Sequence, residues 1–551
     1  MSNPESRTVL RLQNLQVGYE QNRKVIRIVD NLSLELKKGE IVVLLGESGS
    51  GKSTIAKAIT GLLPPSAHIG GGTLQIGSAW IGDVSDTSIR WEQIRGRGIA
   101  MLFQDAQQAL NPVLKIKEHF KETLLFHRIA SSAEEVMTIS AGWLSRLNFT
   151  DPHRILNSYP FQLSGGMCQR ICLALALCLE PEVFVADEPT SALDTVNQKE
   201  VLDVLKSMQT ELGLTVLLIT HDIAVANAVG NRVVVLHQGR IEEEGEVGRV
   251  FSRPQAAYTR QLLSSRSQRT MPAGERELKH SNEPLLEMIE LEKTFHPQKR
   301  VLHNVNLTLN KMEIVGILGQ SGCGKSTLAK CIVGLESPSG GRVMYRGTDI
   351  SRLKGKPKRE VCKQIQIVFQ NARASLNPGR TALQLVQEPL HYLQIGSKKE
   401  REALAVQCLH EVGITGEAQQ RRPPQLSTGQ CQRIAIARAL ALRPEVLVCD
   451  EAVSALDMSV QAQILELLQR LHKQLGFSIV MISHDIRVLR SFCHHIAVMN
   501  HGSFSEGKQS SALLHLSDHP HTRQLLQCAG DLEEGLQQET EGFSFMLQNK
   551  A

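Results

Sequence analysis

Short apolar runs alternate with longer amphipathic stretches along the chain. Helical periodicity between such runs is typical of a parallel sheet with helices on its faces. Residues 9–17 alternate apolar and polar positions, as a half-buried strand does, and residues 113–156 have the pattern of a separate helical subdomain. The pattern therefore predicts an α/β fold. The predicted buried strands are residues 41–45, 183–186, 216–219, 314–318, 446–449 and 479–482.

Landmarks in the first half of the chain recur in the second half at a nearly constant distance. Ser164, Asp187 and His221 each have an identical counterpart 263 residues later, and Lys52 has one 273 residues later. Unrelated domains would not keep one register over several landmarks, so the chain is a duplicated unit. The small length changes are confined to the early part of each copy.

The duplication sets the predicted domain boundaries. We predict tandem domains over residues 8–263 and 285–527, each with a mainly parallel sheet. Residues 264–284 are polar and include proline and glycine, which predicts a linker. Residues 528–551 are rich in Gln, Glu and Gly and are predicted to form a flexible tail.

Composition narrows the class of protein. The chain has 551 residues, of which 42% are hydrophobic, and a net charge of +5. This charge is small for the length, so nucleic acid is not an expected partner. No apolar run approaches the roughly 18 residues that a membrane span needs, and the N-terminus lacks the apolar core of a signal peptide. The 11 cysteines are scattered, which is typical of a reduced, cytosolic protein.

Each copy has a glycine-rich loop between a predicted buried strand and a predicted helix. Such a loop cradles phosphates, because glycines let backbone N–H groups turn inward and the helix start adds partial positive charge. The loop lysine would reach the β- and γ-phosphates, and the serine after it would bind Mg²⁺. One match could be an ordinary turn, whereas two in the same context favour two nucleotide sites. The loop residues are Gly46, Glu47, Ser48, Gly49, Ser50, Gly51, Lys52, Ser53 and Thr54, and Gly319, Gln320, Ser321, Gly322, Cys323, Gly324, Lys325, Ser326 and Thr327.

An Asp–Glu pair ends one buried strand of each copy, and a histidine ends the next. The aspartate would hold Mg²⁺ through water, the glutamate would polarise the attacking water, and the histidine would sense the γ-phosphate. Two acids at a strand end could simply be solvated, but that interpretation is weak for a pair that recurs in register. The residues are Asp187, Glu188 and His221 in the first copy, and Asp450, Glu451 and His484 in the second.

Serine and glycine precede a further strongly helical segment in each copy. Such a helix start again offers N–H groups and a positive dipole end to an anion. Two anion-binding helix starts in one domain require either a second anion or the same anion bound by a neighbouring domain. The residues are Ser164, Gly165 and Gly166 in the first copy, and Ser427, Thr428, Gly429 and Gln430 in the second.

These motifs occur in the order found in ATP-binding-cassette ATPases, and the chain resembles that family twice over nearly its whole length. The resemblance implies two P-loop nucleotide-binding domains, each with an antiparallel β part and a helical subdomain. It implies that the domains pair head to tail within the chain and enclose two ATP molecules with Mg²⁺. Each site would then join one copy's phosphate loop to the serine–glycine segment of the other copy.

Four further positions take their expected roles from the resemblance alone. Tyr19 and Phe295 match the aromatic residue that stacks on adenine. Gln104 and Gln370 match the glutamine that senses Mg²⁺ and the attacking water, and that leads into the region contacting a permease.

Closer features resemble the subfamily of peptide and nickel importers. Residues 159–167 resemble the first of two ATPases in nickel importers, and residues 421–427 and 450–454 resemble the second. The chain therefore looks like a fusion of two usually separate subunits, which would raise their effective concentration to roughly millimolar. The other segments that carry this resemblance are residues 103–112, 258–263, 369–378 and 519–526.

The resemblance implies an ATP-hydrolysing subunit, peripheral at the cytoplasmic face of the inner membrane. Its partners would be two integral-membrane permease subunits and, indirectly, an extracytoplasmic solute-binding protein. The expected cargo is nickel or a metal–opine complex, with di- and oligopeptides second. The alternatives are a soluble tandem cassette acting on ribosomes or DNA, which typically has a long charged linker, and an exporter, which is more often fused to a membrane domain.

Two departures from the family pattern put equal activity of the two sites in doubt. Thr428 stands where the family usually has glycine, and Ala452-Val453 follows the second acidic pair where Pro189-Thr190 follows the first. Neither change removes a catalytic carboxylate, so both sites are expected to bind ATP. Some relatives carry an iron–sulfur cluster, but no cysteine lies between Cys178 and Cys323, and none is expected here.

Overall fold

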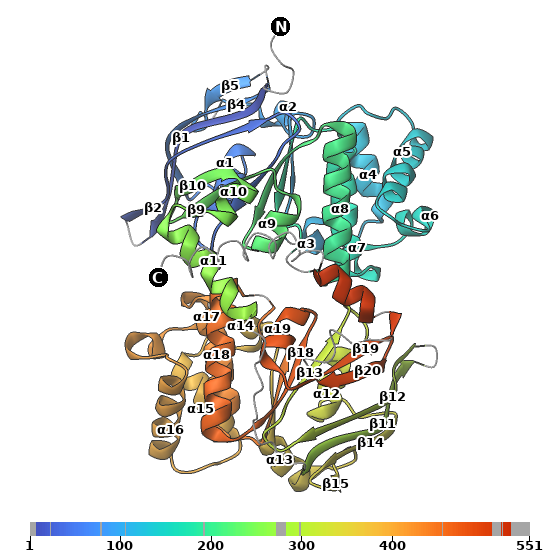
Figure 1. Ribbon diagram of the computed structural model, residues 1–551, viewed down its shortest axis with the longest axis vertical. Coiled ribbons are helices and arrows are strands. Elements are labelled where there is room, and N and C mark those ends of the chain that lie inside the picture. Colours follow the sequence, from blue (N-terminus) through green and yellow to red (C-terminus); the bar gives the residue numbers. More distant parts are fainter. Residues whose placement is uncertain are drawn as a thin grey trace, which may run out of the picture. The chain divides into compact units, whose positions relative to one another are not determined.

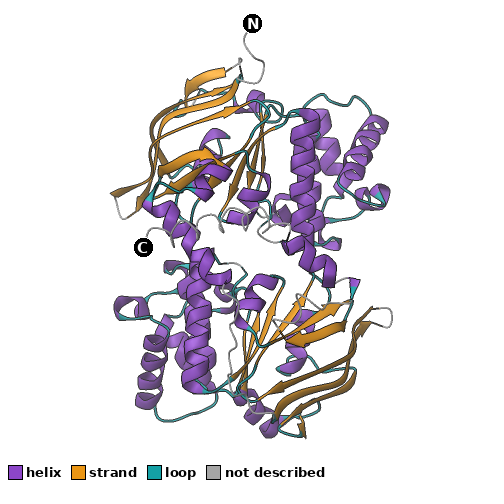
Figure 2. Cartoon of the chain, in the orientation of Figure 1, coloured by secondary structure: helices purple, strands orange, loops and turns teal. Residues whose placement is uncertain are grey.

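The computed structural model divides the chain into two compact units, one with the described residues up to Ser264 together with Gly530, and the other with those from Ser265 to Ala529. Strands and helices alternate in both units (Figures 1 and 2). The prediction of an α/β fold with two cassette-like domains is confirmed. The structure describes residues 7–21, 24–77, 80–86, 88–104, 106–190, 193–270, 283–296, 299–454, 456–509, 519–520 and 522–530.

The first unit contains ten strands and eleven α-helices among the described residues, with one 3-10 turn, η2 (Pro160–Gln162). The strands are β1 (Thr8–Gln21), β2 (Lys24–Lys37), β3 (Ile41–Leu45), β4 (Ala67–Ile76), β5 (Trp80–Asp83), β6 (Ile99–Leu102), β7 (Val183–Asp187), β8 (Thr215–Thr220), β9 (Arg232–His237) and β10 (Arg240–Glu246). The helices are α1 (Lys52–Ile59), α2 (Trp91–Ile94), α3 (Ala106–Ala109), α4 (Ile116–Phe126), α5 (Ala133–Arg146), α6 (Pro152–Leu156), α7 (Gly165–Leu177), α8 (Thr195–Leu212), α9 (Ile223–Val229), α10 (Val247–Ser252) and α11 (Ala257–Thr270).

The second unit repeats this order of elements. Its strands are β11 (Pro284–His296), β12 (Lys299–Asn310), β13 (Ile314–Gly319), β14 (Gly340–Tyr345), β15 (Thr348–Asp349), β16 (Ile365–Val368), β17 (Val446–Asp450), β18 (Ser478–Ser483), β19 (His495–Asn500) and β20 (Ser503–Gln509). Its helices are α12 (Lys325–Ile332), α13 (Gly355–Gln364), α14 (Ala372–Ser375), α15 (Ala382–Tyr392), α16 (Lys398–Glu411), η3 (Gly416–Gln420), η4 (Pro423–Gln425), α17 (Thr428–Leu440), α18 (Met458–Leu475) and α19 (Ile486–Phe492).

Each unit is built on two sheets. The core sheet of the first unit has the order β10-β9-β3-β8-β7-β6, and its strands are parallel except for β10. An antiparallel sheet has the order β2-β1-β4-β5. The second unit has the matching sheets β16-β17-β18-β13-β19-β20 and β12-β11-β14-β15.

The core sheet is buried on both faces, which explains the continuous apolar runs in the sequence. All five residues of β3 are buried. Val43 and Leu45 pack in a cluster with the helices α4 to α9, whereas Val42 and Leu44 pack in a second cluster with the antiparallel sheet and α1. The alternating residues of this strand thus hold together two layers of the first unit.

The predicted helical subdomain is present in both units. Residues 113–156 contain α4, α5 and α6, and α15 and α16 take the same place in the second unit. In the first unit these helices stand apart from the antiparallel sheet (Figure 1).

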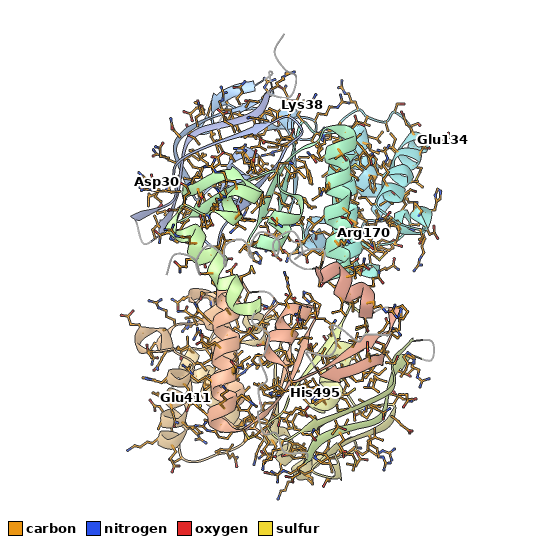
Figure 3. The ribbon with its side chains drawn as sticks, viewed as in Figure 1. Asp30, Lys38, Glu134, Arg170, Glu411 and His495 are labelled. Carbon is orange, nitrogen blue, oxygen red and sulfur yellow. The ribbon has the colours of Figure 1, made fainter. Side chains whose placement is uncertain are left out.

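Arg170 joins the helical subdomain of the first unit to its neighbours (Figure 3). It extends from α7, and its guanidinium lies 4.8 Å from the ring centre of Phe149 and 3.1 Å from a carboxylate oxygen of Glu200 on α8. One side chain therefore fixes three segments.

The element ends follow ordinary helix signals. Asp194 accepts a hydrogen bond from the Asn197 N–H at the start of α8, and Gly213 ends that helix in the left-handed conformation, with φ of 62°. Gly476 ends α18 in the same way, with φ of 73°. None of the described helices combines the length and apolar character that crossing a bilayer needs.

The predicted linker and tail differ from the structure at their ends. Helix α11 continues to Thr270, so the first part of the segment 264–284 is helical, and β11 begins at its last residue. Residues 522–530 are helical as well, and the buried residues Leu525, Cys528 and Ala529 lie on one face of this helix. Residues 271–282 and 531–551 lie outside the described residues, and the domain bounds stay a prediction.

Candidate functional site

The strand order brings the predicted catalytic segments to one edge of each core sheet. In the first unit β3, β8 and β7 are successive neighbours, so the segments after their carboxyl ends lie side by side. These segments are the phosphate loop, His221 and the Asp187-Glu188 pair. In open α/β sheets this is the edge where ligands bind.

The phosphate loops have a backbone that only glycine adopts easily. Gly49 and Gly51 have φ of 81° and 102°. A side chain at Gly46 would overlap the Leu236 carbonyl oxygen. The second loop repeats this conformation, with φ of 85° at Gly322 and 112° at Gly324. The glycines are therefore required by the course of the chain.

The loop lysines lie folded against their own loops. Lys52, 5% exposed, donates hydrogen bonds from Nζ to the carbonyl oxygens of Gly46 and Glu47, each at 2.7 Å. Lys325 makes the same pair of bonds in the second loop at 2.8 Å. Since each lysine also begins a helix, the ammonium and the helix N-terminus add positive charge at one place.

The serine after each lysine is joined to the strand-end aspartate. Ser53 Oγ donates to Asp187 Oδ1 at 3.2 Å, and Ser326 Oγ donates to Asp450 Oδ1 at 3.2 Å. Burial raises the pKa of both aspartates, because a buried carboxylate lacks the solvation of its negative charge.

These groups fit Mg²⁺. A carboxylate and a hydroxyl are hard oxygen ligands, and Mg²⁺ usually takes only one or two from the protein and the rest from phosphates and water. A cation would also supply the charge that the buried aspartates lack. No cluster of three or more His, Cys, Asp or Glu side chains suited to a metal occurs among the described residues.

Glu188 is the centre of the hydrogen bonds in the first unit. Its backbone N–H donates to the Ile219 carbonyl oxygen at 2.9 Å, and its φ is 48°. Gln104 Nε2 donates to Oε2 at 2.7 Å, and His221 Nδ1 lies 3.0 Å from Oε1. Burial acts to raise the pKa of Glu188, but His221 and Lys52 outweigh it and the pKa is lowered. The carboxylate is therefore held charged, as a group that polarises water must be.

Glu451 repeats this arrangement with small differences. Its φ is also 48°, and its N–H donates to the Ile482 carbonyl oxygen at 3.0 Å. Gln370 Nε2 donates to Oε2 at 2.8 Å, His484 Nδ1 lies 3.6 Å from Oε2, and Lys325 Nζ lies 3.7 Å from Oε1. The pKa of Glu451 is lowered, since His484 and Lys325 outweigh burial.

Both glutamates thus adopt the left-handed conformation, which is unfavourable for a residue with a side chain. The cost is about 1 kcal/mol or more, and such residues cluster at active sites. The sequence analysis identified the two glutamates but not their backbone conformation.

The serine–glycine segments form a second group, on other elements of each unit. Ser164 caps α7 and accepts from the Met167 N–H at 3.3 Å. Ser427 caps α17 and accepts from the Gln430 N–H at 3.2 Å, while the Gln430 side chain accepts from the Ser427 N–H at 3.0 Å. The second segment is therefore tied by a reciprocal pair of bonds that Met167 cannot make.

The remaining segment residues, Gly165 and Thr428, are exposed, whereas Gly166 and Gly429 are half-buried. A side chain at Gly429 would lie 2.6 Å from a methyl group of Val460. Glycine is therefore needed at 429 for packing, but position 428 has room for the threonine.

The two aromatic residues lie on the antiparallel sheets. Tyr19 on β1 pairs with Ile26 on β2, two residues before Ile28, whose carbonyl oxygen lies 3.1 Å from where a Cβ of Gly51 would be. Phe295 has the matching position on β11 and is 46% exposed. Both aromatics therefore lie on the strand beside the one that contacts the end of the phosphate loop.

A groove of about 420 Å³ lies next to Gln104 in the first unit. Its lining combines Met101 of β6 and Phe103, which follows that strand, with Thr123 of α4 and Leu175 of α7. It therefore lies between the core and the helical subdomain.

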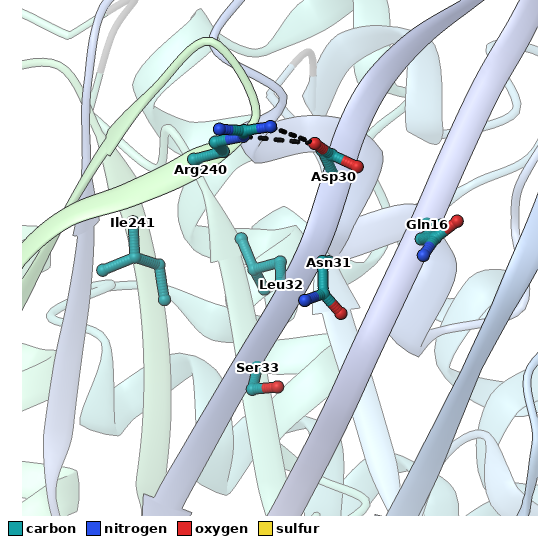
Figure 4. Close-up of a pocket in the computed structure, with 7 residues that line it drawn as sticks. All are labelled: Gln16, Asp30, Asn31, Leu32, Ser33, Arg240 and Ile241. Carbon is teal, nitrogen blue, oxygen red and sulfur yellow. Dashed lines mark hydrogen bonds and ion pairs between the residues drawn. The ribbon is translucent and has the colours of Figure 1, made fainter.

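A hollow of about 630 Å³ lies elsewhere on the first unit (Figure 4). Arg240 Nη2 donates to Asp30 Oδ2 at 2.6 Å, and this ion pair joins β10 to β2. No predicted site residue is among the described residues that line it, which are Gln16, Asp30, Asn31, Leu32, Ser33, Arg240 and Ile241.

Known proteins resemble the chain over both units. The family model described as "ABC transporter" matches residues 29–191 and again residues 302–454. The "Uncharacterized ABC transporter ATP-binding protein YejF" of Escherichia coli (strain K12) is 35% identical over 95% of this chain and 99% of its own length. The "Glutathione import ATP-binding protein GsiA" of the same strain is 35% identical over 94% of this chain and 89% of its own length.

Solved structures match one cassette at a time. The dimeric structure of a post-hydrolysis state of the ATP-binding cassette MJ0796, bound to ADP and Pi, is 33% identical. The match covers 41% of this chain and 99% of that one, with a TM-score of 0.38.

Proposed function

This chain belongs to the ABC transporter family, with two ATP-hydrolysing domains, and we propose that it drives an importer of small peptides. The observation that carries this proposal is the similarity to the glutathione import protein, which extends over 94% of this chain and includes both domains. Glutathione is a short peptide, so that relative favours the peptide cargo over nickel or a metal–opine complex. Nickel rests only on the motifs in the sequence and stays the second candidate.

The site residues receive their roles in this proposal. Lys52 and Lys325 bind the β- and γ-phosphates, and Tyr19 and Phe295 stack on adenine. Mg²⁺, when bound, neutralises charge on the phosphate oxygens. Ser53, Asp187 and Gln104 would hold it in the first unit, and Ser326, Asp450 and Gln370 would hold it in the second.

Hydrolysis is assigned to the two left-handed glutamates. A carboxylate held charged and fixed by hydrogen bonds can accept a hydrogen bond from water and turn its oxygen toward the γ-phosphate. Gln104 and Gln370 donate to these carboxylates and so fix their rotamers. His221 and His484 lower the pKa of the glutamates, and in this proposal each would contact the γ-phosphate.

The groove beside Gln104 is proposed as the contact with one of two membrane permeases. It is lined mainly by apolar side chains, and its lining includes Phe103, the residue before the glutamine that donates to Glu188. A protein seated there would influence the catalytic carboxylate through Gln104. Peripheral attachment at the cytoplasmic face of the inner membrane, and supply by a solute-binding protein outside it, follow from this role.

Co-expression with the cognate permeases tests the proposal. The chain should be recovered with membranes only when the permeases are present. Thr123→Arg places a long charged side chain in the groove and should reduce this recovery, because the added side chain would occupy the space of the permease segment and would have to be desolvated with it. Thr138→Arg on α5 adds the same charge at an exposed position outside the groove and should have no effect.

Two results would contradict the proposal. Unchanged fractionation with and without the permeases would favour a tandem cassette that acts on ribosomes or DNA. Equal membrane recovery of the Thr123→Arg and Thr138→Arg proteins would remove the groove from the permease contact.

A further inference from the structure

The strand that carries Phe295 has a lysine where its counterpart in the first unit is apolar. Lys293 pairs with Leu302 across the antiparallel sheet, and Val17 pairs with Val29 in the same register. Val17 is 1% exposed and Lys293 is 9% exposed. A buried lysine in place of a buried valine requires a specific set of partners.

Those partners come from the segment after the helix of the phosphate loop. Lys293 Nζ donates to Glu336 Oε2 at 2.8 Å and to the Ser337 carbonyl oxygen at 2.8 Å. Glu336 has its counterpart in Leu63, which packs against the apolar core of the first unit. Two residues of one apolar cluster in the first unit thus have an ion pair as their counterpart in the second, and the fold accepts both.

The same ammonium lies against the aromatic ring. Lys293 Nζ is 4.8 Å from the ring centre of Phe295, within the range of a cation–π interaction. The ammonium cannot move away, because its two oxygen partners hold it. The ring is still 46% exposed, so a second flat group can stack on it.

We propose that Lys293, fixed by Glu336, is a positioning residue that holds Phe295 as the stacking platform for adenine in the second nucleotide site. The proposal rests on the proposed function, since it takes Phe295 as the residue that contacts adenine. A ring fixed before binding loses less side-chain freedom when the nucleotide arrives. A cation against one face also withdraws electron density from the ring and favours a second π system on the other face.

The consequence is a difference between the sites. The second site should hold the adenine of ATP more tightly than it would with the apolar pair found in the first unit. Removing the ammonium should weaken ATP binding at that site about fivefold, as expected for a partly exposed cation–π contact. The affinity of ligands that contact only the phosphate loop should not change.

The test exchanges the ion pair for the apolar pair of the first unit. The double variant Lys293→Val with Glu336→Leu copies Val17 and Leu63 and leaves no unpaired charge, so it is expected to fold. Lys293→Arg keeps a cation at the ring and serves as the matched control. Thermal melting confirms that all three proteins are equally folded.

Photolabelling with 8-azido-ATP separates the two sites within the full chain. The protein is irradiated on ice at increasing probe concentration and cut at glutamate. Labelling of the peptide with Phe295 and of the peptide with Tyr19 is then measured separately by mass spectrometry. Inorganic tripolyphosphate, which has no base, competes in a parallel series.

In the double variant, the probe concentration that gives half-maximal labelling of the Phe295 peptide should be about fivefold higher. The corresponding concentration for the Tyr19 peptide should not change. The arginine variant should behave as the wild type, and the inhibition constant of tripolyphosphate should stay constant. An unchanged probe concentration for half-maximal labelling of the Phe295 peptide would overturn the proposal. An equal loss of affinity for tripolyphosphate would overturn it too, because Lys293 would then support the phosphate loop and not the ring.

A different result would show that Phe295 does not contact adenine. If ATP does not protect the Phe295 peptide of the wild-type protein from labelling while it protects the Tyr19 peptide, adenine does not bind at Phe295. That outcome rejects the role of Phe295 and the proposal for Lys293 together, but it leaves the importer function untouched.

Discussion

The two units keep the same geometry at the reacting groups and change the side chains that support them. The serine–aspartate distance is 3.2 Å in both units, and the glutamine–glutamate distances are 2.7 and 2.8 Å. Both glutamates have φ of 48°. The histidine–glutamate distances differ, at 3.0 and 3.6 Å. The agreement of the other contacts indicates that both copies are built for the same chemistry.

Side chains away from the candidate site differ more between the two units. Glu40 before β3 is paired with Arg232, whereas its counterpart Glu313, 2% exposed, is paired with His495 on β19 (Figure 3). A buried carboxylate needs a cationic partner, and either an arginine or a histidine can supply the positive charge at the partner position. The difference teaches that the chemistry is fixed at the carboxyl ends of the strands, while the other end tolerates changes that alter the response to pH.

Loss of both loop lysines should reduce the rate of ATP hydrolysis more than any other change, because it disables both units. Lys52→Ala with Lys325→Ala removes the two ammonium groups that the proposal assigns to the β- and γ-phosphates, and each such donor supplies about 3 kcal/mol, a hundredfold or more in rate. Steady-state phosphate release measures the loss. Either single variant should keep part of the activity, and full activity in the double variant would reject the assignment of both sites.

His495 should make the stability of the second unit depend on pH. The hydrogen bond to Glu313 raises the pKa of His495 above its usual value near 6.5, and burial only partly opposes it. The stabilisation is therefore complete below about pH 6.5 and is lost as pH rises through the higher folded-state pKa. His495→Arg keeps its charge and should remove this dependence.

The size of the pH effect is small, since the His495 side chain is 36% exposed. We expect about 1 kcal/mol after allowance for solvent screening, or about 3 °C in melting temperature for a domain of this size. The measurement is the change in melting temperature from pH 6 to pH 9, in the wild type minus that in His495→Arg. Arg232→His should introduce the same dependence into the first unit, and identical pH curves for all three proteins would contradict the account.

Replacement of Thr428 should have the smallest effect on the rate of ATP hydrolysis. It is exposed in the first turn of α17 and is not among the described non-glycine residues with positive φ, so its backbone is unstrained. Only its side chain can hinder the approach of a phosphate, on the head-to-tail pairing that the resemblance implies. Thr428→Gly in a Glu451→Gln protein should raise the remaining hydrolysis about twofold, or about 0.4 kcal/mol in the barrier. A lower rate in a folded protein would show that the threonine assists the site.

Most of the placement of the candidate site residues could be predicted from the sequence, because it depends on residue type at the ends of apolar runs. The buried run 41–45 predicts a strand, and the strand order then brings the loop, Asp187 and His221 together. Neighbouring parallel strands have their carboxyl ends at one edge, so the motifs needed no further information to be placed.

Other features have no local signal in the sequence. Glutamate rarely adopts the left-handed conformation, so nothing at Glu188 or Glu451 predicts φ of 48°. The contact of Lys293 with Glu336 joins segments 43 residues apart and depends on side-chain packing. The helical ends at Thr270 and at residues 522–530 extend beyond the predicted boundaries, since composition does not show where packing against a unit stops.

The comparison of Glu188→Gln with Glu451→Gln tests the central claim most directly, namely that two cassettes of the same geometry hydrolyse ATP at unequal rates. Each change removes the charge of one catalytic carboxylate and nearly preserves its shape. Phosphate release by the two full-length proteins is measured side by side at saturating ATP. The account predicts that Glu451→Gln abolishes most of the activity and that Glu188→Gln leaves more of it. The reason is that, in the head-to-tail pairing that the resemblance implies, Thr428 completes the site of Lys52 and Glu188 and slows hydrolysis there. Equal losses, or a larger loss from Glu188→Gln, would contradict it.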